Sequence, residues 1–174
     1  TYKSVIYDNK ALEEAATKYD YTKDVPLKTL EIAFDANCNL ACSYCNASFS
    51  TQWQNDIKKN GAYQNLVSDG ARAFQQDGSW AMPYGKRNEG NPYVDAFFKW
   101  WDMELKDTLE ELRVTGGEAT MSPDFWRLIE WWKQNPDCNV RFSVNSSLGA
   151  KPQLMKKLVE ATHSFKQFDL YTYN

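Results

Sequence analysis

The chain has 174 residues and a mass of 20.1 kDa, with 43% hydrophobic, 15% aromatic and 25% charged residues. This composition is typical of one globular domain with a sizeable core, and it excludes a disordered or fibrous chain. A net charge of -3 and a pI near 5.2 supply no electropositive field, which argues against nucleic-acid binding as the main task.

No apolar run approaches the roughly 18 residues that a membrane span needs, and no basic start with an apolar core marks a secretory signal. We therefore expect a cytoplasmic protein without a membrane partner. Because the first residue is Thr1 rather than Met, we also expect that an upstream segment is missing from this sequence.

The first 26 residues are interpreted as a lead-in, with a short strand or extended segment at 2–7 and a helix at 11–19. The first strong strand signal is Thr-Leu-Glu-Ile-Ala-Phe at 29–34, which runs directly into a cysteine-rich segment. The cysteines are therefore predicted to lie on a loop at the C-terminal end of a strand.

Three of the four cysteines, Cys38, Cys42 and Cys45, form a C-x3-C-x2-C motif. With no secretory signal, this spacing favours metal or cluster ligation over disulfides. Iron–sulfur clusters are held by thiolates, usually four for a cubane, so three ligands would leave one iron open to a cofactor. The alternatives are a zinc site that adds Cys138 or His163, or simply buried thiols.

Residues 46–90 are interpreted as an insertion without regular structure, rich in Asn, Gln, Gly and Asp. Its aromatic residues exceed what a linker requires, so we expect it to fold over the cysteine edge and contribute to a substrate pocket. The alternative is a disordered or partner-binding loop. These aromatic residues are Phe49, Trp53, Tyr63, Phe74, Trp80 and Tyr84.

An Asn-Pro cap opens a helix predicted over 92–106, with apolar residues on one face. A strand at 111–115 follows and ends in Gly-Gly-Glu, and Ser122 caps the next helix. The β-loop-α unit of the cysteine region is thus repeated.

A third strand is predicted at 140–145, a helix at 152–162 and a fourth strand at 168–173. Strands alternating with helices imply parallel pairing through right-handed crossovers, and hence an α/β fold with its functional loops at the strands' C-terminal ends. A hydrophobic last strand would be exposed at a sheet edge, so we expect a truncated barrel rather than a closed one.

The C-x3-C-x2-C motif after the first strand, with Tyr44 before the last cysteine, resembles the radical S-adenosylmethionine (SAM) superfamily. Gly116-Gly117-Glu118 after the second strand resembles the Gly-Gly-Glu motif of the same family. The resemblance covers residues 27–174 apart from the insertion. It implies a TIM-like partial (β/α)6 barrel, of which about four strands lie in this core domain.

The resemblance implies that Cys38, Cys42 and Cys45 hold three irons of a [4Fe–4S] cluster and that the fourth iron binds SAM. Tyr44 would lie against the adenine. Reduction by a donor such as flavodoxin or ferredoxin would cleave SAM to methionine and a 5′-deoxyadenosyl radical that abstracts hydrogen from a substrate. The substrate, a peptide or a small molecule, is not readable from the sequence.

Gly116, Gly117 and Glu118 would bind the methionyl amine of SAM, and the absence of Cβ would let the glycine backbone approach the cofactor. The alternative is a tight turn followed by a solvated glutamate. Ser143 and Asn145 share one face of the third strand and resemble positions that bind the SAM ribose or carboxylate. The alternative for Asn145 is a residue that ends a strand and caps a turn.

Two other functions remain open on the residues alone. One is an iron–sulfur electron carrier or scaffold that uses no SAM, and the other is a zinc-stabilised binding module. Cys138 and His163 precede strands rather than follow them, so both are expected at the opposite edge of the sheet, away from the chemistry.

Overall fold

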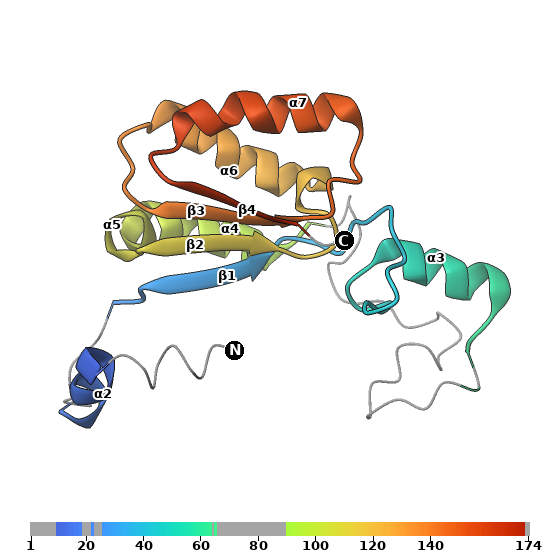
Figure 1. Ribbon diagram of the computed structural model, residues 1–174, viewed down its shortest axis with the longest axis horizontal. Helices are drawn as coiled ribbons and strands as arrows, with labels where there is room; N and C mark the ends of the chain where they lie inside the picture. Colours follow the sequence, from blue (N-terminus) through green and yellow to red (C-terminus); the bar gives the residue numbers. More distant parts are fainter. Residues whose placement is uncertain (1–9, 19–21, 23–25, 64, 66–89, 173–174) are drawn as a thin grey trace.

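The computed structural model describes residues 10–18, 22, 26–63, 65 and 90–172. Four parallel strands form one sheet in the order β1-β2-β3-β4 (Figure 1). The strands are β1 (Thr29–Ala33), β2 (Glu111–Thr115), β3 (Arg141–Ser146) and β4 (Phe168–Thr172). The predicted α/β class and parallel pairing are confirmed, whereas the strand predicted at 2–7 lies outside the described residues.

Helices connect these strands, and three of them begin with proline in their first turn. They are α2 (Lys10–Thr17), α3 (Thr51–Asn60), α4 (Pro92–Trp100), α5 (Lys106–Thr108), α6 (Pro123–Gln134) and α7 (Pro152–Ala161). A π-helical turn, η2 (Trp101–Leu105), joins α4 to α5, and short 3-10 turns form η3 (Ala119–Met121) and η4 (Thr162–Ser164). The helices predicted at 11–19, 92–106 and 152–162 are thus confirmed within a few residues.

The hydrophobic core lies between one face of the sheet and α4, η2, α6 and α7. Alternate strand residues supply it, including Leu112 and Phe142, which are fully buried. Trp101 and Trp132 are fully buried beside them, and the ring centroids of Trp132 and Phe142 lie 4.7 Å apart. The helix tryptophans at these two positions are therefore core residues.

The opposite face of the sheet is polar. The Arg113 guanidinium lies 3.0 Å from the Glu111 carboxylate, 3.8 Å from that of Glu31, and 4.9 Å from the centroid of the Tyr171 ring. The Ser143 hydroxyl donates to Glu111 at 2.9 Å. A closed TIM barrel usually fills this face with layers of bulky apolar side chains, and this charged network departs from that pattern.

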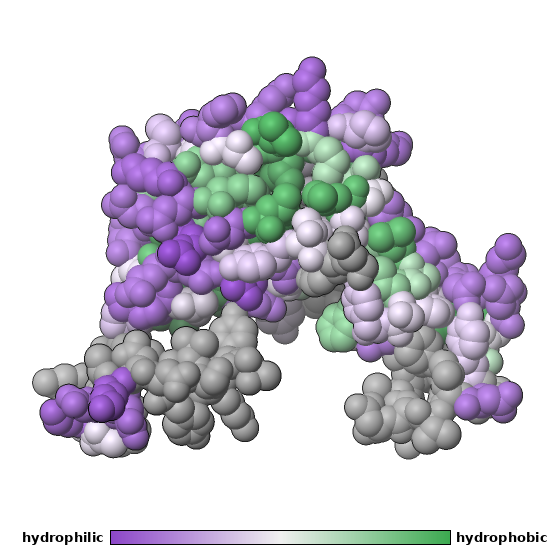
Figure 2. All heavy atoms as spheres, viewed as in Figure 1, coloured by the Kyte–Doolittle hydropathy of each residue, from purple (hydrophilic) through white to green (hydrophobic). Residues whose placement is uncertain are grey.

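Among the described strands, β1 pairs with β2 alone and β4 with β3 alone, so both lateral edges of the sheet are unpaired. Figure 2 shows apolar surface over α7 and the nearby β4. Val159 on α7 is 65% exposed and Leu170 on β4 is 40% exposed. The described residues thus form an open four-stranded sheet.

Candidate functional site

The loops that follow β1, β2 and β3 meet at one edge of the sheet, on the right of Figure 1. The backbone N–H of Glu118, after β2, donates to the carbonyl of Asn37, after β1, at 2.7 Å. The Asn39 side-chain amide donates to the carbonyl of Gly149, after β3. The predicted meeting of the cysteine loop and the Gly-Gly-Glu turn at one edge is present in the structure.

The three cysteines of the motif are partly buried and form no disulfide. The Cys45 N–H donates to the Cys42 carbonyl at 3.0 Å, and the Leu40 N–H donates to Cys38 Sγ at 3.4 Å. Burial raises the pKa of the Cys45 thiol, the backbone of Asn46 lowers it, and charge on Cys38 and Cys42 raises it. The thiol of Cys45 is therefore within electrostatic reach of the other two cysteines.

Thiols are the soft ligands that iron–sulfur clusters and zinc require, so the donor chemistry of this loop fits a cluster. Within the described part of the chain, no three Cys, His, Asp or Glu side chains converge closely enough to hold a single metal ion. The three thiols thus lie on one loop, but their sulfur atoms do not converge on a single metal position.

The glycines of the Gly-Gly-Glu turn lie against the protein backbone. A Cβ on Gly117 would lie 2.3 Å from the carbonyl oxygen of Asn37 and 2.8 Å from that of Ala36. Gly116 has φ +115°, and a Cβ there would lie 2.9 Å from the Asp35 carbonyl oxygen. Close approach to the cysteine loop therefore requires both glycines, a reason separate from the cofactor contact predicted for them.

The Glu118 side chain is 1% exposed and accepts five hydrogen bonds from the protein. Thr120 donates through its N–H at 3.3 Å and its hydroxyl at 2.6 Å, and the Ser146 hydroxyl donates at 2.7 Å. Ser147 donates through its N–H at 3.0 Å and its hydroxyl at 2.8 Å. The alternative of a solvated loop glutamate is wrong, because this carboxylate joins the loops after β2 and β3.

The other predicted cofactor residues differ in whether their side chains are already bonded within the protein. Ser143 is fully buried and its hydroxyl is bonded to Glu111. Asn145 keeps a buried side-chain oxygen that finds no hydrogen-bond partner among the described residues. Tyr44 is 66% exposed on the cysteine loop. Asn145 therefore keeps an unsatisfied acceptor, whereas the Ser143 hydroxyl is already engaged.

Residues 51–60 form helix α3, so the prediction of an insertion without regular structure is wrong for this part. The Ser50 hydroxyl caps α3 by accepting from the N–H groups of Gln52 and Trp53. Ile57, one turn after Trp53, is buried. This cap and the four-residue apolar spacing were the available sequence signals. The predicted pocket aromatics Phe74, Trp80 and Tyr84 lie outside the described residues.

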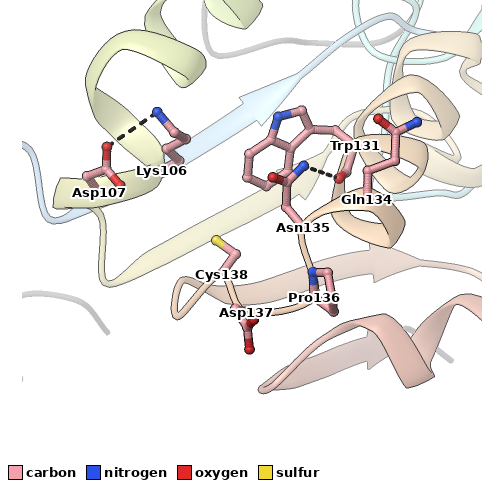
Figure 3. A pocket seen from close by; sticks show the side chains of 8 residues that line it. All are labelled: Lys106, Asp107, Trp131, Gln134, Asn135, Pro136, Asp137 and Cys138. Atoms are coloured by element: carbon pink, nitrogen blue, oxygen red, sulfur yellow. Dashed lines mark hydrogen bonds and ion pairs between the residues drawn. The ribbon is translucent and has the colours of Figure 1, made fainter.

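Cys138 lies at the opposite edge of the sheet, as predicted. Its side chain lines a cavity of about 350 Å³ together with Lys106, Asp107 and Trp131 (Figure 3). Burial is the main effect on the Cys138 thiol and raises its pKa. His163 is exposed in η4, which precedes β4. Both residues are thus remote from the cysteine loop in the topology.

In the described part of the chain, no helix has the length and apolar character needed to cross a bilayer. Comparisons with protein-family models, with curated proteins and with solved structures found no match to this chain.

Proposed function

We propose that this chain is the cluster-binding part of a radical SAM enzyme, with its four strands belonging to a partial (β/α)6 barrel. The observation that carries the proposal is the contact between two motifs far apart in the sequence. The Glu118 N–H of the Gly-Gly-Glu turn donates to Asn37, next to Cys38, at 2.7 Å. An enzyme that binds SAM at an open iron needs the cluster ligands and the SAM-binding backbone at one sheet edge.

In this proposal Cys38, Cys42 and Cys45 hold three irons of a [4Fe–4S] cluster. The reduced cluster with SAM at its open iron would supply one electron that cleaves SAM to methionine and a 5′-deoxyadenosyl radical. The electron would come from a flavodoxin- or ferredoxin-like donor. This chain's own share is to hold the ligands, orient SAM and shelter the reaction from water.

The proposal assigns the SAM contacts to the same edge. Asn145 offers its buried carbonyl oxygen as an acceptor, and Gly116 and Gly117 leave backbone without Cβ beside the cysteine loop. Tyr44 offers an exposed ring on that loop. The polar sheet face around Arg113 would then line the chamber that receives a hydrophilic substrate.

Anaerobic reconstitution with iron and sulfide tests the proposal. We expect the broad visible absorption of a cubane cluster with about four irons per chain, lost when Cys38, Cys42 or Cys45 is replaced by Ala. Cys138→Ala is the matched control and should keep the cluster. Loss of the cluster in that control would make Cys138 a ligand and remove the open iron.

The alternatives give different results in the same preparation. A colourless protein that retains one zinc through the three cysteines would support a zinc-stabilised module. A cubane cluster that binds no SAM by calorimetry would support an electron carrier or scaffold. Either result would contradict the radical SAM proposal.

A further inference from the structure

Residues 50–53, the N-cap and first turn of α3, donate hydrogen bonds to the cysteine loop, residues 36–45. The four acceptors are the backbone carbonyls of every second residue from 36 to 42. The four donors lie within one turn of the helix, so the loop from Ala36 to Cys42 passes close to the N-terminal end of α3. The donor and acceptor pairs are Thr51 N–H to Ala36 (2.9 Å), Thr51 Oγ1 to Cys38 (3.1 Å), Ser50 Oγ to Leu40 (2.8 Å) and Trp53 Nε1 to Cys42 (3.1 Å).

The Thr51 hydroxyl forms hydrogen bonds with both polar backbone groups of Cys38. The Cys38 N–H donates to Thr51 Oγ1 at 3.0 Å, while the same hydroxyl donates to the Cys38 carbonyl at 3.1 Å. A hydroxyl has one donor and two acceptor positions, so these two bonds are compatible. The backbone of the first cluster cysteine is thereby held by one side chain.

The loop is held from its other side as well. The carbonyl of Asn37, between two residues bonded to α3, accepts from the Glu118 N–H at 2.7 Å. Residues of the loop therefore alternate between bonds to α3 and a bond to the Gly-Gly-Glu turn. This arrangement restrains the loop on both sides through protein contacts alone.

Helix α3 packs against the segment that precedes it, around Ala47. Ile57 and Ala47 are each 1% exposed and form a small apolar cluster with Trp53. Gln54 Nε2 donates to the Ala47 carbonyl at 2.8 Å. The ring of Trp53 meets that of Tyr63 edge to face, with centroids 6.0 Å apart. The residues that donate to the cysteine loop therefore belong to a helix that is itself packed against the protein.

We propose that Ser50, Thr51 and Trp53 are positioning residues that hold the cysteine loop in shape before any metal binds. The backbone of such a loop loses less conformational freedom when the cysteine side chains, which do not yet converge, rotate onto a metal, so the metal binds more tightly. The cluster as natural ligand rests on the function proposed above, but the order of the metal-free loop does not. These residues then belong to the cofactor site although they follow the motif.

Amide hydrogen exchange of the metal-free chain tests the inference. In Thr51→Val we expect the Cys38 amide to exchange about tenfold faster, since the loss of one hydrogen bond is worth up to that factor. In Trp53→Phe, which keeps an aromatic ring but lacks the donor, exchange should rise around Cys42. Gln52→Ala, at an exposed position in the same turn, is the control and should leave exchange unchanged.

Cobalt(II) is the second probe, because its thiolate complexes absorb strongly enough for titration. We expect about tenfold weaker cobalt binding in Trp53→Phe and Thr51→Val than in Gln52→Ala, with all cysteines intact. Thr51→Ser restores the hydroxyl and should recover both properties. Circular dichroism of the helices identifies a variant that has unfolded. If Thr51→Val has unfolded, the comparison of Thr51→Ser with wild type decides whether the hydroxyl alone holds the loop.

The two proposals fail separately in these experiments. Exchange at Cys38 and Cys42 that matches the Gln52→Ala control in both variants would overturn the positioning role. Wild-type protein that binds neither cobalt nor iron would overturn the proposed function, while exchange in the metal-free chain would still decide the positioning role.

Discussion

At the residue scale, Gly117 is the point where the turn after β2 touches the cysteine loop. A Cβ at this position would lie 2.3 Å from the Asn37 carbonyl oxygen, a distance that forces backbone to move. We expect Gly117→Ala to lower the free energy of unfolding by about 1–3 kcal/mol, as overpacking does elsewhere. The measurement is urea denaturation followed by circular dichroism.

Gly90→Ala is the matched control, because a Cβ at Gly90 meets nothing within 4 Å. The control should unfold at the wild-type urea midpoint. If Gly117→Ala does the same, the contact with Asn37 is not a constraint, and space for a ligand is the remaining reason for glycine at this position.

Glu118 is the residue whose charge joins two loops. Glu118→Gln replaces one acceptor oxygen by an amide group that would face donors already pointing at it. We expect a loss of about 1–3 kcal/mol in unfolding free energy, the cost of unsatisfied buried polar groups. Glu110→Gln, at a side chain 73% exposed and paired with Lys28, should change stability little. Equal midpoints for the two variants would contradict the assigned role.

Replacement of Asn145 should affect SAM binding and protein stability differently. Its buried oxygen has no hydrogen-bond partner among the described residues, so replacing it removes an unsatisfied acceptor. We expect Asn145→Ala to unfold no earlier than wild type and yet to bind SAM more weakly on reconstituted protein. Calorimetry with SAM and urea denaturation check the two halves. Unchanged SAM affinity would exclude Asn145 from the cofactor site.

At the element scale, Ile57 is the one residue of α3 that is fully buried. Ile57→Ala should detach the helix from Ala47, because large-to-small changes at buried sites cost about 2–5 kcal/mol. We expect faster amide exchange throughout 51–60 and, as a consequence, at Cys38. Lys58→Ala, an exposed neighbour, is the control. Unchanged exchange at Cys38 in Ile57→Ala would show that the first turn holds the loop without the rest of α3.

At the scale of the whole molecule, the open edge at β4 adjoins the exposed Val159 and Leu170. Unpaired strand edges and apolar patches favour association. We expect the chain to self-associate as its concentration rises and Val159→Lys to reduce this in sedimentation velocity. Met103→Lys adds the same charge at a 71% exposed residue of η2 and is the control. Equal association in both variants would place the contact elsewhere.

The sequence by itself determined the layered fold and its functional edge. Strand β2 was predicted with its observed bounds, and the other three strands within a residue, because each is a short stretch with apolar residues at alternate positions between clear breaks. The cysteine and Gly-Gly-Glu motifs follow adjacent strands, and parallel pairing necessarily brings such loops to one edge. Local patterns were sufficient for these features.

Only the tertiary structure decided which protein groups those motifs contact. The need for glycine at 117 comes from the carbonyl of Asn37, and the partners of Glu118 include Ser146 and Ser147 on the next loop. Helix α3 was missed because its polar composition masks one short apolar stripe. The contacts of Gly117 and Glu118 depend on residues distant in the chain, so no local pattern could contain them. Long-range packing decides them, since it alone brings a donor or a carbonyl to each position.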